Sequence, residues 1–135
     1  MVDLLKLQGI WTQYGLEKLA SIMPGEEPLA IAFCAVGDGN GSLPVVEPSQ
    51  TELLNEVWRG PVNGVTVNPD DPTDVLVDAV IPNNVGGFFI REWGIFDADN
   101  KLIAVGPHDE MHKPLLTDGQ AAEFLERFHL PVSNT

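Results

Sequence analysis

The stretch that decides the fold is IPNNVGGFFIREWGIFDADNKLIAVG, residues 81–106. Residues 88–97 are rich in aromatic and aliphatic side chains and alternate with the period of a β-strand. One face of this strand would carry Phe88, Ile90, Glu92, Gly94 and Phe96. A second apolar run over residues 101–105 follows the turn-forming residues 98–100. The pattern therefore predicts a β-hairpin.

The 11 Pro and 13 Gly divide the rest of the chain into short elements. Thr12 can cap a helix that runs to about Ile22 and ends at the following Pro-Gly pair. Further strands are expected at residues 4–10, 29–36, 74–81 and 123–132, with an extended segment over 57–67, one helical turn at 51–55 and an irregular segment at 107–119. One N-terminal helix and a mainly antiparallel sheet of several short strands, with no βαβ rhythm, predict the α+β class. We expect a single domain over residues 1–135.

Charge and composition exclude several classes of partner. Seven Lys and Arg oppose 20 Asp and Glu, for a net charge of −13. This balance argues against binding to nucleic acid or to an anionic membrane surface, because both need cations. No apolar run is long enough to span a bilayer, and the N-terminus lacks the features of a secretory signal. A basic protein partner is compatible with the charge.

Two acidic segments, one of them rich in glycine, invite a search for bound ions. The Gly37–Gly41 loop lacks the third glycine, the following helix and the lysine that phosphate-binding loops use. Neither this loop nor the segment from Asp97 to Lys101 has the ligand spacing of a calcium loop. Both segments are better interpreted as tight turns.

His108 and His112 form the one pattern that suggests a metal enzyme. An i, i+4 pair on a helix could bind zinc, as in zinc proteases. However, Asp109 stands at the general-base position, and Pro107 and Pro114 leave room for little more than one helical turn. Two solvated loop histidines are the simpler interpretation.

No other residue pattern supports catalysis. The single cysteine, Cys34, lies in an apolar strand pattern, where a buried, unreactive side chain is expected. The chain has no Gly-x-Ser-x-Gly nucleophile motif, and no pair of carboxylates stands out for acid–base chemistry. We therefore predict no catalytic residue, no cofactor and no metal, and we expect the protein not to be an enzyme.

Charged residues inside the aromatic strand need partners. Arg91 and Glu92 are adjacent, so in a regular strand they point to opposite faces and cannot pair simply with each other. A buried unpaired charge is costly, so each must find a partner elsewhere or lie at an interface. The pair Trp58-Arg59 repeats the combination of an aromatic residue beside an arginine, which protein–protein interfaces favour. The alternative, that the aromatic residues are core and the charges exposed, stays open.

Taken together, three segments resemble the N-terminal domain of the tail fibres of contractile-tailed phages, the tail-collar fibre family. They are VGDGNGSLPV at 36–45, EVWR at 56–59 and residues 81–106. Lys113-Pro114 and the closing strand are also similar, so the resemblance covers nearly the whole chain. The predicted motif and interface residues are Gly37, Asp38, Gly39, Glu56, Trp58, Arg59, Gly86, Gly87, Arg91, Glu92 and Trp93.

The resemblance implies a structural role. Such domains lie at the virion end of a fibre and dock it onto the baseplate of the tail, and the fibres are commonly homotrimers. It implies baseplate proteins as partners, a place in the virion tail and synthesis in the cytoplasm of a bacterial host. Relatives continue into a shaft and a receptor-binding tip, so host recognition does not carry over. The alternative is a glycan- or receptor-binding domain of a short tail fibre, which would need an exposed aromatic platform such as Trp11 or Trp58.

Overall fold

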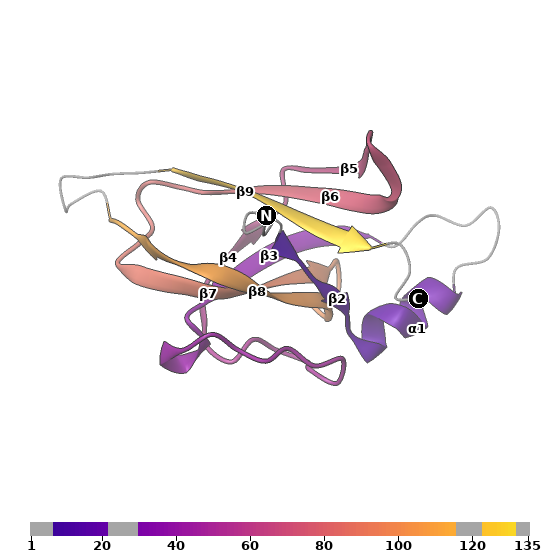
Figure 1. Cartoon of the computed structure of the whole chain (residues 1–135), viewed down its shortest axis with the longest axis horizontal. Helices are drawn as coiled ribbons and strands as arrows, with labels where there is room; N and C mark the ends of the chain where they lie inside the picture. Colours follow the sequence, from indigo (N-terminus) through magenta and orange to yellow (C-terminus); the bar gives the residue numbers. More distant parts are fainter. Residues whose placement is uncertain (1–6, 22–29, 116–122, 132–135) are drawn as a thin grey trace.

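The computed structural model describes residues 7–21, 30–115 and 123–131, which form two packed β-sheets, one short α-helix and the 3₁₀ turn η1 (Gly39–Gly41) (Figure 1). The first sheet has the strand order β1 (Leu7–Gln8), β9 (Phe124–Pro131), β6 (Asp71–Ile81) and β5 (Gly64–Asn68). The second has the order β2 (Ile10–Trp11), β8 (Leu102–Lys113), β7 (Phe88–Asp97), β3 (Ile31–Gly37) and β4 (Glu56–Pro61). Neighbouring strands are antiparallel except for the pair β1–β9, which is parallel.

The predicted α+β class is wrong, because the described chain is mainly β and its strands form two sheets. Its α-helix, α1 (Gln13–Ser21), has nine residues, whereas β6, β7 and β8 have 10 to 12 residues each. The irregular segment expected after Pro107 is mostly strand, because β8 continues to Lys113. Residues 51–55 are a series of bends and not a helical turn. The first error arises because Pro107 is tolerated in β8 beside a shift in the register with β7. The second arises because the buried side chain of Leu53 anchors residues 51–55 as a loop.

The expected first strand is divided between the sheets at Gly9. β1 pairs with β9 in one sheet and β2 pairs with β8 in the other. A Cβ atom at Gly9 would lie 2.4 Å from the ring of Trp93, so a glycine is needed where the chain crosses between the sheets. The part of the predicted strand before Leu7 lies outside the described residues.

Helix α1 begins as the sequence predicts. The Thr12 hydroxyl accepts a hydrogen bond of 3.0 Å from the backbone N–H of Gly15, which is the contact expected of an N-cap. The same hydroxyl donates to the carbonyl of Leu102 at 2.8 Å and so joins the helix to β8. The predicted end of the helix lies outside the described residues.

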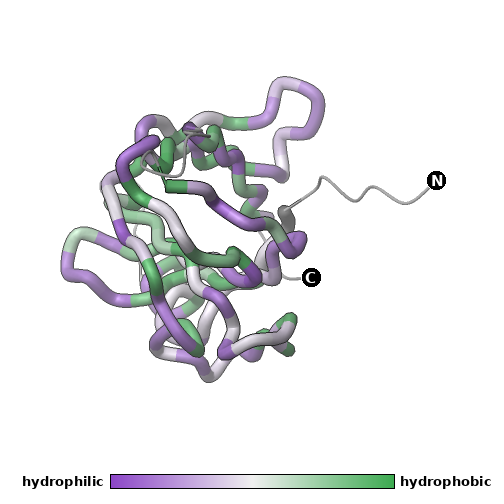
Figure 2. The backbone as a smooth tube through the Cα atoms, turned by 90° about the vertical axis from the view of Figure 1, so that its left-hand side faces the viewer, coloured by the Kyte–Doolittle hydropathy of each residue, from purple (hydrophilic) through white to green (hydrophobic). Residues whose placement is uncertain are grey.

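The sheets enclose the main hydrophobic core. Its centre is a stack between Trp93 of β7 and Phe128 of β9, with ring centroids 4.5 Å apart. Both side chains are fully buried, and burial of a large apolar side chain contributes about 1.5–3 kcal/mol. Figure 2 shows short hydrophobic and hydrophilic stretches alternating along the backbone, as strands with one buried face require.

A second, smaller core lies on the outer face of the five-stranded sheet. Leu53, which is 5% exposed, packs there with Ala35, Phe96, Leu102 and Val105. Leu53 belongs to residues 42–55, which have no regular secondary structure and run beneath the five-stranded sheet in Figure 1, on the side away from the four-stranded sheet. We call this segment the 42–55 loop.

Candidate functional site

Glu92 is the centre of the predicted motif residues. Its side chain is fully buried, and its two carboxylate oxygens accept three backbone hydrogen bonds. The donors are the N–H groups of Gly39 at 3.1 Å, Leu54 at 2.9 Å and Asn55 at 2.9 Å. A buried carboxylate is tolerated when its oxygens are satisfied in this way. Glu92 therefore joins the glycine loop to the end of the 42–55 loop.

Arg91 contacts the same glycine loop as Glu92. Its guanidinium donates to the carbonyl of Asp38 at 3.0 Å and forms an ion pair with Glu110 at 2.5 Å. The strand register shifts between Ile90 and Glu92, as at a β-bulge. Our expectation that the two charges do not pair with each other and find partners elsewhere is confirmed, because each binds the glycine loop separately. Since both charges have partners within the chain, they do not require an interface.

The three predicted loop residues have distinct structural roles. A Cβ atom at Gly37 would lie 2.4 Å from a carboxylate oxygen of Glu92, so only glycine allows this approach. Gly39 has φ +65, in the region that favours glycine. Asp38 accepts hydrogen bonds of 2.9 Å from the Asn55 side chain and from the backbone of Asn40. These bonds, together with nearby Arg91, lower the pKa of Asp38 despite some burial.

Strand β4 carries the second group of predicted residues. Arg59 forms hydrogen bonds of 3.1 and 2.8 Å with both carboxylate oxygens of Glu56, and it also donates to Asn100. Its guanidinium lies 3.7 Å from the centre of the Phe96 ring, a cation–π contact. Trp58 is half-buried and packs against the main core. Register pairing of Gly37 with Glu56 places this group beside the glycine loop.

The third group surrounds a buried lysine that the sequence analysis did not single out. Lys113 is fully buried, and its ammonium donates to the carbonyls of Val85 at 2.8 Å and Pro114 at 3.2 Å. Burial lowers its pKa. Gly87 donates its backbone N–H to the carbonyl of Lys113 at 2.7 Å, and a Cβ at Gly86 would lie 2.2 Å from the Pro114 oxygen. The two glycines thus allow the turn to close over the lysine.

Trp93, the last predicted residue, lies in the main core and not on the surface. It is fully buried, and the ideal Cβ positions of Gly9 and Gly106 fall within 2.4–2.7 Å of its ring. The structure therefore brings together Gly37, Asp38, Gly39, Arg91 and Glu92, with β4 beside them. Gly86 and Gly87 belong to the turn around Lys113.

The hydrogen bonds leave no free anion or cation site in the glycine loop. The N–H groups of Gly39 and Asn40, which a phosphate would need, already bind Glu92 and Asp38. In the second acidic segment, Asp97 accepts from the backbone of Asp99 and Lys101 and from the hydroxyl of Tyr14 at 2.8 Å. Burial and this bond to Asp97 raise the pKa of Tyr14 to about 12. Both segments are turns, as the sequence suggests, and carboxylates of Asp38, Glu92 and Asp97 bind their backbone N–H groups.

The helix that a zinc pair would need is absent from this region, because His108 and His112 lie on strand β8. Four residues along a strand span about 13 Å, too far for two imidazoles to share one ion. His112 contacts the ring of Phe89, with centroids 5.1 Å apart. Within the described residues, no group of three or more His, Cys, Asp or Glu side chains could hold a metal ion.

His108 has a role that the sequence analysis missed. It is 3% exposed, and its Nε2 lies 2.8 Å from a carboxylate oxygen of Glu126, on β9 of the other sheet. Its Nδ1 lies 2.7 Å from the carbonyl oxygen of Asp109 and must donate to it. Burial favours the neutral ring, but the bond and charge of Glu126 outweigh it and raise the pKa of His108. The pair therefore connects the two sheets through a buried hydrogen bond.

Cys34 is a buried core residue, as predicted. It is 1% exposed, and burial together with the charge of Glu126 raises the pKa of its thiol to about 12. Such a thiol is protonated at neutral pH and is a poor nucleophile.

Neither tryptophan proposed as a sugar platform is fully exposed. Trp11 is 4% exposed, and its indole N–H donates to the carbonyl of Pro131. Trp58 has its ring folded over Gly60, where a Cβ would lie 2.4 Å from it. These two residues therefore do not provide the platform that the glycan-binding alternative requires.

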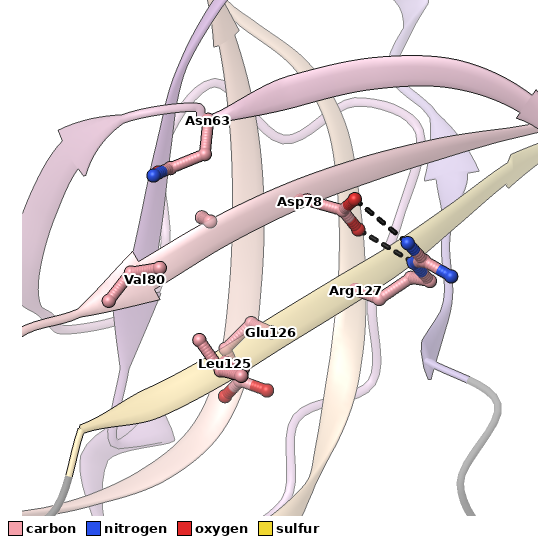
Figure 3. Close-up of a pocket in the computed structure, with 7 residues that line it drawn as sticks. Asn63, Asp78, Val80, Leu125, Glu126 and Arg127 are labelled. Carbon is pink, nitrogen blue, oxygen red and sulfur yellow. Dashed lines mark hydrogen bonds and ion pairs between the residues drawn. The ribbon is translucent and has the colours of Figure 1, made fainter.

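A groove of about 420 Å³ lies along the four-stranded sheet (Figure 3). Its polar lining includes Asp78 and Arg127, which form two hydrogen bonds of 2.7 and 2.9 Å with each other. This pair lowers the pKa of Asp78. Leu125, which is 76% exposed, lies at the same groove. The charged groups satisfy each other and leave no unpaired charge aimed at a ligand.

The comparison with known proteins decides the family. The pattern of the phage tail-collar fibre protein N-terminal family matches residues 5–135. The chain belongs to this family. The tail-collar domain is also 40% identical over 116 residues to a probable tail fiber protein of Escherichia phage P2. The match covers 85% of this chain but only 17% of that relative, so the chain spans about a sixth of its length.

No solved structure matches the tail-collar domain. Among its described residues, no helix is long and apolar enough to cross a membrane.

Proposed function

We propose that this chain anchors a phage tail fibre to the baseplate of the tail, supports host attachment in that way, and transforms no substrate. The observation that carries this proposal is the family match over residues 5–135, in a family defined as the N-terminal part of tail-collar fibre proteins. Baseplate proteins are the proposed partners, and the virion tail is the proposed location. Residues 1–135 would act as a single attachment domain.

The internal contacts of the motif residues support a mechanical role. The charged groups of the motif form hydrogen bonds with backbone groups and side chains of the same chain, as Glu92, Arg91 and Arg59 show. Such contacts fix loops relative to the sheets and give a pre-organised body, which loses little conformational entropy on docking. A coupling element needs this property, whereas an active site needs reactive groups that remain available.

We also propose that the fibre formed by this chain is a homotrimer. A trimer matches the threefold fibres expected of the family. Mass measurement in solution tests whether the domain alone assembles. A monomeric domain together with a trimeric longer fibre would assign trimerisation to other parts of the fibre.

Imaging and co-purification test the attachment role. The tagged chain is expected at the baseplate in electron micrographs of assembled tails, and it should co-purify with baseplate proteins. Co-purification at roughly 0.05 and 0.5 M salt separates charge-driven from apolar contacts, since screening is much stronger at the higher value. Absence of the chain from finished tails, or no complex at either salt concentration, would contradict the proposal.

A further inference from the structure

The 42–55 loop combines exposed apolar side chains with carboxylates. Val45 is 86% exposed, Leu43 59% and Leu54 50%. Glu47 and Glu52, on the same loop, are also exposed. Large apolar side chains that remain in water beside charges of one sign are typical of a surface that a protein partner covers.

The loop is held in place although it lacks regular structure. Its end is fixed by Glu92, through the N–H groups of Leu54 and Asn55. Its middle is fixed by the carbonyl of Pro48, which accepts a hydrogen bond of 2.7 Å from the N–H of Gln13 at the start of α1. Leu53 is buried in the smaller core, and Val46 packs against that core. Loops of more than about 12–15 residues without secondary structure are uncommon, and they are often functional.

The start and the end of the loop lie on either side of the glycine turn. The ideal Cβ position of Gly39 is 3.5 Å from the ring of Pro44, next to Leu43. The side chain of Asn40 donates to the carbonyl of Leu54 at 3.3 Å. Leu43 and Leu54 therefore lie at the two ends of the loop, beside the turn residues Gly39 and Asn40.

The 42–55 loop itself carries only negative charges, Glu47 and Glu52, and no Lys or Arg occurs between Lys18 and Arg59. The cations beside the loop are engaged elsewhere, because Arg59 pairs with Glu56 and Arg91 pairs with Glu110. On the four-stranded sheet Asp78 pairs with Arg127, and Asp74 is bonded to the ring of His129. That sheet has exposed Leu125 and is also acidic, since its strands carry Asp71, Asp74, Asp78 and Glu126 against Arg127. In the 42–55 loop, Glu47 and Glu52 form no ion pair with another described residue and stand beside exposed apolar side chains, so their charge is available to a cationic partner.

We propose that the 42–55 loop is the docking surface of this domain, and that its partner presents an apolar patch rimmed by Lys and Arg. This inference rests on the proposed attachment function and identifies the partner as a basic surface of a tail protein. Leu43, Val45 and Leu54 would leave water on docking, and Glu47 and Glu52 would steer the encounter.

Two triple variants of the full chain test the apolar part. The first is Leu43→Thr, Val45→Thr and Leu54→Thr. The second is a matched control on the four-stranded sheet, Val65→Thr, Val67→Thr and Leu125→Thr, where the replaced side chains are 43%, 58% and 76% exposed. The probe is a preparation of tails purified from particles assembled without this protein, and binding is measured by co-sedimentation. Unfolding midpoints confirm that both variants fold.

The loop variant should bind these tails about tenfold more weakly or worse, and the control should bind like the wild type. Equal binding by all three proteins, or a loss confined to the control, overturns the loop assignment while the attachment function stands. No binding by the wild type overturns both. A loop variant that loses only self-association and still binds tails shows that a second copy covers the loop, and it overturns the proposed partner.

A double variant that removes two negative charges from the loop tests whether the partner is cationic. In Glu47→Gln with Glu52→Gln, tail binding should depend less on salt than in the wild type, because fewer charges are screened. The matched control is Glu17→Gln with Glu123→Gln, two exposed carboxylates outside the loop, which should keep the wild-type salt dependence. Equal salt dependence in the two variants overturns the basic-rim part of the proposal.

Discussion

The carboxylate of Glu92 accepts a hydrogen bond of 3.1 Å from the backbone N–H of Gly39, which lies 53 positions earlier in the chain. The same side chain holds Leu54 and Asn55, so two loops depend on one buried charge. Because the strand that carries Glu92 lies within the five-stranded sheet, the position of both loops is set by the sheet.

Replacing Glu92 should therefore destabilise the whole domain. Glu92→Gln retains the shape but has one acceptor oxygen, and its NH₂ group would face backbone N–H donors. Hydrogen bonds to charged groups contribute about 1.5–3 kcal/mol each, so we expect unfolding free energy to fall by roughly 3 kcal/mol. Urea denaturation measures the change. Glu52→Gln, on the exposed loop, is the control and should stay within about 0.5 kcal/mol of wild type. Equal stability of the two variants would show that the Glu92 bonds contribute little.

Gly37→Ala should be destabilising for a steric reason. The added Cβ would lie 2.4 Å from a carboxylate oxygen of Glu92 and 2.5 Å from the backbone oxygen of Asn55. Relief of this overlap requires the loop to move, and we expect a cost of about 2 kcal/mol. Gly64→Ala is the matched control, because nothing lies within 4 Å of its ideal Cβ position. Thermal unfolding of both variants checks the prediction, which fails if Gly37→Ala unfolds at the same temperature as Gly64→Ala.

The His108–Glu126 pair should make stability fall as the pH rises above about 6.5. The folded state raises the pKa of His108 above its ordinary 6.5. The stabilising contribution is therefore complete below about pH 6.5 and is lost as pH rises through the folded pKa. The measurement is unfolding free energy against pH for the wild type and for Glu126→Gln, which lacks the charged partner.

The difference in stability between these two proteins should shrink as pH increases. NMR titration of the His108 ring gives the folded pKa directly. The exposed His112 provides the control, since His112→Gln should leave the pH profile unchanged. A His108 pKa below 6.5 would falsify this account of the pair.

Lys113→Met should destabilise the turn at Gly86 and Gly87. Replacement of a buried ion by an apolar residue can be neutral when its partners are removed as well. Here the acceptors are the carbonyls of Val85 and Pro114, which remain and would lose their donor. We expect a loss of about 2 kcal/mol, because an unsatisfied buried polar group costs about 1–3 kcal/mol. The exposed Lys101→Met is the control. Hydrogen exchange at Gly87 reports whether the turn opens, and unchanged exchange would count against the assigned role.

Local patterns in the sequence were sufficient for part of the fold. The Thr12 cap and strand β7 follow from short-range chemistry, and both are confirmed. The division into two sheets was not predictable in this way, because it depends on which strands pair over long distances. The β6–β9 ladder, for example, joins residues about 50 positions apart. Periodicity identifies strands but does not specify their partners.

The candidate site was predictable only in its residue types. The sequence shows that Arg91 and Glu92 need partners, and both have them. It does not reveal that both side chains bind the same glycine loop, 53 positions earlier in the chain. Lys113 and His108 were missed because their partners, Val85 and Glu126, lie 28 and 18 positions away. Residues 106–114 show no alternation of apolar and polar side chains, so no local pattern marks His108 or Lys113 as buried.

The place of β9 has a mechanical consequence for a fibre. This strand lies between β1 and β6, and its ladder with β6 covers eight residue pairs. A pull directed along β9 acts across all of these hydrogen bonds at once, since ladder bonds lie perpendicular to the strands. Rupture then requires the strand to slide past both neighbours in a single step, whereas a strand peeled from a sheet edge loses its bonds one after another. Tension along β9 is thus resisted in the geometry in which a β-sheet is strongest.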